Sequence, residues 1–124
     1  MQEQGFLKSP EHRFVMLKDR LWRALRIIID VRTQTGQMTY DEAADLMARE
    51  LHFPREQACG DLNWYSQSPT VPMGYALGWS IINRLRDQEQ QRLGGKFTLR
   101  EFHDKLLSAG SISLPLVEQR HFMR

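Results

Sequence analysis

The sequence contains a single cysteine, Cys59, among its 124 residues. One cysteine excludes a disulfide within the chain, and it also excludes the cysteine-rich class of zinc modules. A reactive thiol requires an activating base nearby. We therefore interpret Cys59 as a small apolar residue in or near the core.

Long hydrophobic runs are also lacking. The longest run, around "IIID" at residues 27–30, is far shorter than a membrane-spanning helix requires. The first ten residues, "MQEQGFLKSP", do not show the basic-then-apolar layout of a signal peptide. The sequence thus predicts neither a membrane span nor a signal peptide, and it leaves the localisation open.

Charge of one sign is not in large excess. Lys and Arg number 17 and Asp and Glu number 15, which gives a formal net charge of +2. We expect no nucleic-acid partner, because no strong positive field is available. The three tryptophans Trp22, Trp64 and Trp79 permit an alternative interpretation as base-stacking residues. Their helical positions beside apolar neighbours favour the core instead.

Catalytic and metal-binding motifs are absent from the sequence. There is no HExxH, no glycine-rich phosphate loop and no GxSxG elbow. His52 and Glu56 are four residues apart, but Pro54 interrupts the helix that would present them together. His103 and Asp104 are adjacent and point in different directions on a helix. We expect no complete catalytic set, no metal site and no cofactor site in this chain alone, which for this chain argues against an enzyme.

What the sequence does contain is a series of helical patterns. Ser9 and Pro10 have the chemistry of an N-cap and a first helical residue. Apolar residues then recur every three or four positions and form one stripe, and we expect this helix to end between Asp30 and Thr33. The stripe consists of Phe14, Leu17, Leu21, Leu25 and Ile28. The basic residues off the stripe are interpreted as a solvated flank: Arg13, Lys18, Arg20, Arg23 and Arg26.

Further helix starts and stops follow along the chain. The capping box "TYDE" at 39–42 predicts a helix to about Leu51, and Pro54 starts another over about 54–66. Pro72 is expected to begin a long helix that ends at Gly94-Gly95. A second capping box, "TLRE" at 98–101, predicts a helix up to Gly110, followed by a short turn around 114–119. The pattern predicts an all-α fold of about five to six helices in a compact bundle, as a single domain over residues 1–124.

Three stretches together resemble a known family. They are "LWRALRIIIDVRTQTGQMTYDEAADLM", "WYSQSPTVPMGYALGWSIINRLR" and "LGGKFTLREFHDKLLSAGSISLPL". From about Gln4 to Leu116 the chain resembles the C-terminal third of the bacterial domain of unknown function 885 family. Members of that family resemble zinc metallopeptidases of the HExxH-plus-glutamate type. Their zinc ligands lie upstream, so the resemblance implies that this chain is a truncated C-terminal segment and that zinc belongs only to the full-length family.

The same resemblance suggests residues that would line a cleft. The family pattern DxRLHTG corresponds here to Asp30, Arg32, Gln34 and the two residues that follow, with glutamine where the family has histidine. Glutamine forms hydrogen bonds but does not titrate near neutral pH. Tyr65 is retained, although Trp64 replaces the arginine that usually precedes it. By analogy Arg32 would bind a substrate carboxylate.

The stretch "PTVPMGYALG" at 69–78 resembles the family's proline–tyrosine–glycine block. By analogy with oligopeptidases, the Tyr75 hydroxyl would stabilise the oxyanion at the scissile carbonyl. Pro72 would fix the start of the helix, and Gly74 and Gly78 would let a neighbouring backbone come close. The alternative is that the glycines mark a helix crossing and that Tyr75 covers the edge of the core.

Three functions remain open from the sequence. The chain is a non-catalytic, truncated or stand-alone helical domain; or it is an interaction module that forms a homo-oligomer or binds a partner over exposed apolar surface; or it completes a zinc peptidase in trans with an upstream HExxH-bearing polypeptide. The first two together are favoured. The substrate and the partner are not specified by the sequence.

Overall fold

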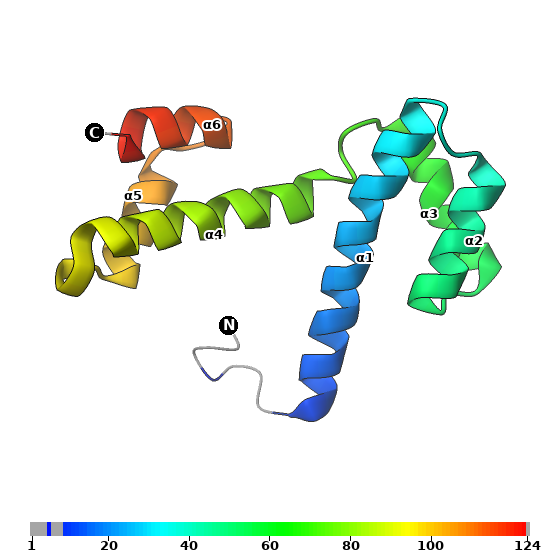
Figure 1. The fold of residues 1–124 in the computed structure, drawn as a ribbon, viewed down its shortest axis with the longest axis horizontal. Helices are drawn as coiled ribbons and strands as arrows, with labels where there is room; N and C mark the ends of the chain where they lie inside the picture. The colour runs from blue at the N-terminus through cyan, green and yellow to red at the C-terminus, as the bar shows by residue number, and fades with distance from the viewer. Residues whose placement is uncertain (1–4, 6–8, 124) are drawn as a thin grey trace. The chain divides into compact units, whose positions relative to one another are not determined.

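The computed structural model describes residue 5 and residues 9–123. Within them the chain forms α1–α6, the 3₁₀-helix η1 and the π-helix η2, and it contains no strand, which confirms the all-α prediction. The chain divides into two compact units, Met1–Ala76 and Leu77–Arg124 (Figure 1). The expectation of a single domain stays a prediction. None of the described helices is both long and apolar enough to cross a membrane.

The first unit is built from three helices, α1 (Pro10–Gln34), α2 (Tyr40–Leu51) and α3 (Arg55–Gln67). α2 and α3 pack on the C-terminal part of α1, and the N-terminal part of α1 extends beyond them (Figure 1). Their shared core consists of Leu25, Ile29, Ala43, Ala44, Met47, Leu51, Ala58, Leu62 and Tyr65. The small alanines allow α2 and α3 to approach α1 closely.

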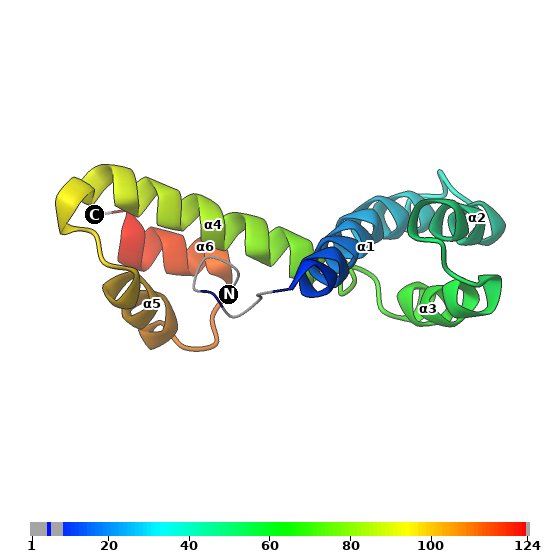
Figure 2. The ribbon, with the colours of Figure 1, turned by 90° about the horizontal axis from the view of Figure 1, so that it is seen from below.

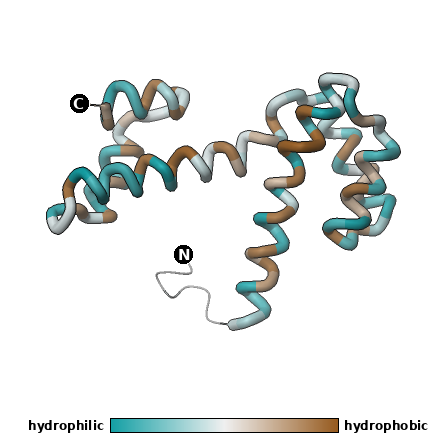
Figure 3. The backbone as a smooth tube through the Cα atoms, viewed as in Figure 1, coloured by the Kyte–Doolittle hydropathy of each residue, from teal (hydrophilic) through white to brown (hydrophobic). Residues whose placement is uncertain are grey.

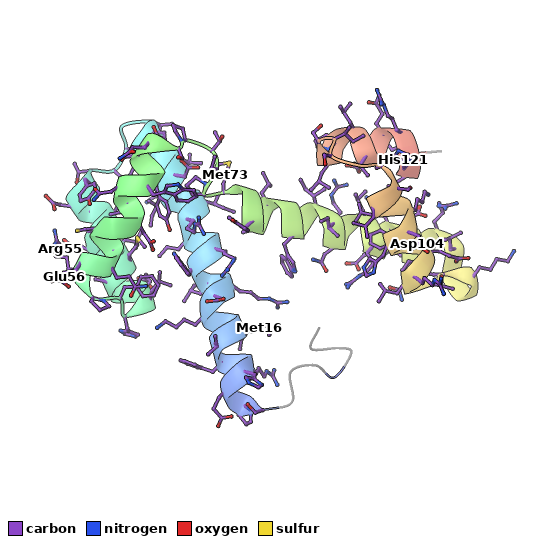
Figure 4. The ribbon with its side chains drawn as sticks, turned by 180° about the vertical axis from the view of Figure 1, so that it is seen from behind. Met16, Arg55, Glu56, Met73, Asp104 and His121 are labelled. Atoms are coloured by element: carbon purple, nitrogen blue, oxygen red, sulfur yellow. The ribbon has the colours of Figure 1, made fainter. Side chains whose placement is uncertain are left out.

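Local capping chemistry sets the helix starts in this unit. The Ser9 hydroxyl accepts a hydrogen bond from the His12 amide at 3.3 Å, so α1 begins at Pro10 as the sequence predicts. Thr39 and Glu42 form the predicted capping box at the start of α2. Arg55, labelled in Figure 4, is the first residue of α3. Its guanidinium pairs with two carboxylates of α2, that of Asp41 at 2.7 Å and that of Asp45.

α4 (Gly74–Leu93) begins two residues later than the Pro72 start that the sequence predicts. Residues 68–73 instead form two turns, closed by hydrogen bonds from the Val71 amide to the Ser68 carbonyl and from the Gly74 amide to the Val71 carbonyl. Pro72 is buried in the second of these turns. Met73, which directly precedes α4, is labelled in Figure 4.

The second unit contains the rest of α4, then η1 (Gly94–Lys96), α5 (Leu99–Ser108), α6 (Leu114–Val117) and η2 (Glu118–Phe122). Figure 2 shows α5 and α6 beside α4. The core of this unit is Leu85, Phe102, Val117 and Phe122. Buried Glu89 of α4 accepts hydrogen bonds from Arg92 at 2.8 and 2.9 Å and from Lys105 at 3.4 Å.

The apolar stripe of α1 does not face the core, contrary to the expectation. Of its five residues, only Leu25 is buried, at the edge of the face that packs on α2 and α3. The other four are exposed: Phe14, Leu17, Leu21 and Ile28. A second set, with Trp22, Leu25 and Ile29, makes the contacts within the first unit. α1 therefore has two apolar faces, one packed and one exposed to solvent.

Candidate functional site: a buried arginine among aromatic rings

The least expected feature of the first unit is a buried arginine. Arg26 follows Trp22 by four residues and precedes Ile29 by three, so these residues share the packed face of α1. Only 7% of Arg26 is exposed. The expectation that Arg26 belongs to a solvated flank is wrong, because the packed face of α1 is not the stripe with the strongest periodicity.

Four aromatic rings surround the Arg26 guanidinium. Its Cζ lies 5.1 Å from the ring centre of Tyr65, 5.2 Å from that of Tyr75, 5.4 Å from that of Trp64 and 5.5 Å from that of Trp22. All four distances are within the range of cation–π attraction. The rings come from α1, α3 and the first turn of α4, so the arginine joins three segments of the unit.

The guanidinium has no hydrogen-bonding partner or ion pair among the residues that the structure describes. Its Nε is enclosed and unbonded. Asp61 of α3 contributes a negative charge, but its Oδ2 is likewise enclosed and unbonded. Burial raises the pKa of the Asp61 carboxyl, while the charge of Arg26 acts to lower it. The cluster therefore holds a cation and a carboxylate that are not bonded to each other, an arrangement that costs stability.

Tyr65 is placed by a hydrogen bond that joins α3 to α1. Its ring is almost fully buried, and its hydroxyl accepts from Trp22 Nε1 at 3.1 Å. Burial raises the pKa of Tyr65, and the Trp22 hydrogen bond and the charge of Arg26 oppose that rise. The hydroxyl is therefore protonated at neutral pH. In this arrangement Tyr65 is a structural link between two helices.

Tyr75 forms the accessible side of the cluster. It lies in the first turn of α4 and is 60% exposed. Its ring centre is 5.9 Å from Arg23 Cζ in addition to its contact with Arg26, and its hydroxyl bonds to no described residue. A free hydroxyl beside two guanidinium groups is suited to binding an anion such as a carboxylate.

The other predicted cleft residues are only partly brought together. Asp30 is buried, and its Oδ1 accepts from the Thr70 amide at 3.3 Å, which holds the turn before α4. Gln34 Nε2 donates to the Tyr65 backbone carbonyl at 3.4 Å. Arg32 lies two residues after Asp30 on α1, so it points away from it, and its side chain is exposed and bonds to no described residue.

A small groove lies next to two of these residues. It has a volume of about 190 Å³, and Gln34, Tyr40 and Tyr65 are among its lining residues. The Tyr40 hydroxyl donates to the neighbouring Cys59 carbonyl at 2.9 Å. Tyr75 and Arg32 are not among the lining residues, so this groove does not unite the five predicted cleft residues.

The expectation that the glycines near Tyr75 admit a neighbouring backbone stays a prediction. A side-chain carbon built on Gly74 would meet no atom within 4 Å, and one on Gly78 would meet only Leu114 Cδ1, at 3.7 Å. The structure therefore shows no neighbouring backbone at either glycine within the described residues. The expectation of core tryptophans is wrong for two of the three, since Trp64 and Trp79 are exposed.

Four residues of the cluster were not among the predicted cleft residues: Arg26, Asp61, Trp22 and Trp64. A signal for Arg26 exists in the sequence, because Trp22, Leu25 and Ile29 form a second apolar face at helical spacing and Arg26 lies on it. No comparable signal exists for Asp61, whose burial depends on how α3 packs on α1. No group of three or more potential metal-ligating side chains gathers in the part of the chain that the structure describes.

These features define an all-α protein of two helical units, with a buried arginine among aromatic rings in the first. The chain belongs to the family described as bacterial protein of unknown function (DUF885), whose family model matches residues 1–120. The predicted family is thereby confirmed. No curated protein and no solved structure matches the chain. The likeness to zinc metallopeptidases stays a prediction.

Proposed function

We propose that this chain is a non-catalytic helical interaction domain, related to the C-terminal part of zinc metallopeptidase-like proteins, that binds another polypeptide through α1. The observation that carries the proposal is the exposed apolar face of α1, here called the α1 seam. The seam residues occupy positions a and d of three successive heptads. They are Phe14, Leu17, Leu21, Ala24, Ile28 and Val31, and the five large ones are 43–67% exposed.

A seam of this kind is unusual for a helix that already has a packed face. A surface helix in a globular protein has one apolar stripe toward its core and polar residues opposite. α1 buries Leu25 and Ile29 against α2 and α3, yet beyond its hydrophilic first turn apolar segments recur between hydrophilic ones up to its C-terminal end (Figure 3). Leaving a second apolar stripe in water costs free energy that a partner helix would recover.

The bonding of the predicted cleft residues supports a role without chemistry. The Tyr65 hydroxyl holds Trp22, Asp30 holds the turn at Thr70, and Gln34 bonds to the backbone of α3. These bonds are structural, although the second carboxylate oxygen of Asp30 is enclosed and unbonded. Binding of another polypeptide accounts for the exposed seam.

In-cell crosslinking tests this proposal directly. A photoreactive phenylalanine analogue at position 21 of the seam should crosslink to another polypeptide, which mass spectrometry identifies. The same analogue at position 15 is the matched control, because Val15 is exposed on the same helix but lies about 120° around it from Leu21, outside the seam and its flanks. Equal crosslinking from both positions, or none from position 21, would contradict the proposal.

The crosslinked species also separates the remaining alternatives. Self-association stays a prediction, and it would give a crosslink between two copies of the chain. The second candidate function is completion of a zinc peptidase in trans, and the exposed Tyr75 ring beside the Arg23 and Arg26 guanidinium groups favours it. That function would give a crosslink to an HExxH-bearing polypeptide, and mixing the two should produce peptidase activity that Arg26→Gln weakens.

A further inference from the structure

The positions that flank the α1 seam carry charge of only one sign. In a heptad these are positions e and g, which lie beside the apolar contact and choose the partner. From residue 13 to residue 34 of α1 they include no acidic residue. Their basic members are Arg13, Lys18, Arg20 and Arg32, and the others are Leu25, Ile27 and Gln34.

The acidic residues of α1 do not offset this flank. Asp19 lies outside positions e and g and pairs with Arg23 at 3.2 Å, four residues along the helix. Asp30 is buried on the packed face. Glu11 lies in the first turn, before the seam begins. Wherever the flank of the seam is charged, its charge is therefore positive.

Resting on the proposed function, we infer that the occupant of the α1 seam is an amphipathic helix of another polypeptide with Glu or Asp at its flanking positions. A second copy of this chain is a poor occupant. In two parallel copies Arg13 lies beside Lys18 of the second copy, and in neither orientation does an acidic residue at e or g neutralise the basic residues of the flank. An acidic flank on the partner instead gives these basic residues opposite charges to pair with.

The sizes of the seam residues indicate which side chains a partner helix needs. Its a positions hold Phe14, Leu21 and Ile28, whereas the central d position is the small Ala24. A partner helix fills the space over Ala24 with a large side chain, because a helix interface packs to the density of a protein interior. The occupant is thus apolar at its own a and d positions, with a bulky residue at the centre and acidic residues on both sides.

Two synthetic 25-residue helical peptides test the inference with the full chain. Both carry Leu at positions a and d; one carries Glu at e and g, and the other carries Lys. Fluorescence anisotropy should give an affinity at least about tenfold higher for the Glu peptide, and raising the salt from about 50 to about 500 mM should weaken it as the charges are screened. Leu21→Gln should abolish binding, and Val15→Gln should leave it unchanged. The double change Arg13→Glu with Arg32→Glu should reduce the preference for the Glu peptide.

Each contrary result has its own meaning, provided that circular dichroism shows each variant to be folded. If both peptides bind equally well and binding still requires Leu21, the inference of an acidic partner would be overturned, but the proposed function would stand. If sedimentation experiments show that the chain self-associates through the seam and neither peptide binds, the acidic partner would be overturned in favour of a second copy of the chain. No binding of either kind would overturn both the acidic partner and the proposed function.

Discussion

Replacing Arg26 by methionine tests whether the buried guanidinium is kept for stability. Methionine removes the charge and the unbonded Nε but retains a long, flexible side chain among the rings. We expect Arg26→Met to change the free energy of unfolding by less than about 1 kcal/mol. Arg26→Ala, which also leaves space unfilled, should cost about 2–5 kcal/mol.

The magnitude follows from terms of opposite sign. Four cation–π contacts at 5.1–5.5 Å contribute about 2–4 kcal/mol in total, at about 0.5–1 kcal/mol each, and methionine loses them. Against this loss, methionine removes an enclosed donor without an acceptor, which costs about 1–3 kcal/mol and more when it is charged. Sulfur–aromatic contacts return about 0.3–1.5 kcal/mol. The sum lies near zero.

Urea unfolding at pH 7, followed by tryptophan fluorescence, measures both variants, because Trp22 and Trp64 line the cluster. A loss in Arg26→Met as large as that in Arg26→Ala would refute the reasoning. It would mean that the cation–π attraction of the four rings exceeds the cost of desolvating the guanidinium. Arg26 would then be a structural cation, and its position beside Tyr75 would no longer argue for a binding role.

Three other predictions concern stability and use thermal or urea unfolding monitored by circular dichroism. Tyr65→Phe should lower the free energy of unfolding by about 1–3 kcal/mol, because Trp22 Nε1 loses its acceptor. Tyr75→Phe should change the free energy of unfolding by no more than about 0.5 kcal/mol. A loss of several kcal/mol in Tyr75→Phe would show that its hydroxyl is structural. Burial raises the pKa of Asp61 above its unfolded value, so its ionised form destabilises the fold and this penalty disappears as the pH falls below about 3.9. Asp61→Asn should therefore raise the melting temperature at pH 7 but not near pH 3, and an equal effect at both would contradict this. The hydrogen bonds from Arg92 lower the pKa of Glu89, so Glu89→Gln should destabilise the protein at pH 7, with the difference from wild type lost as the pH falls through the lowered pKa; a difference that persists there would count against the ion pair.

The helix ends were predictable because their causes are local. Ser9 and the Thr39–Glu42 pair satisfy the first amides of α1 and α2, and these bonds depend only on residues within one turn. Gly94 and Gly110 have positive φ values of 54° and 69° just past the ends of α4 and α5. Such interactions are encoded in four or five consecutive residues, so the sequence alone identifies them.

The start of α4 was predicted less well because its cause is not local. Proline is equally suited to a first helical residue and to a turn. Here the choice depends on Asp30 of α1, whose carboxylate accepts from the Thr70 amide across 40 residues of sequence. Thr70 has a positive φ of 70°, which a β-branched residue adopts only when its surroundings impose it. The helix therefore begins after Pro72, at Gly74.

The sequence predicted some of the residues of the candidate site, but it did not predict how they are arranged. Asp30, Gln34 and Tyr65 are close to the cluster or the groove, but Arg32 lies apart from them on α1. The family pattern gives consecutive positions, and it does not say which positions share a helix face. The site centres on Arg26, which a pattern of exposed basic residues made easy to overlook.

The two faces of α1 explain this outcome and bear on function. The packed face mixes Trp22, Arg26 and Asp30 with aliphatic residues, because it meets two helices and a turn whose shapes and charges differ. The seam from Phe14 to Val31 is uniformly apolar and keeps a regular heptad spacing. A regular repeat of that kind suits contact with one straight helix. The strongest periodicity in α1 is thus the one that α2 and α3 leave uncovered, and we expect a surface with such spacing to be matched by a helix from another polypeptide.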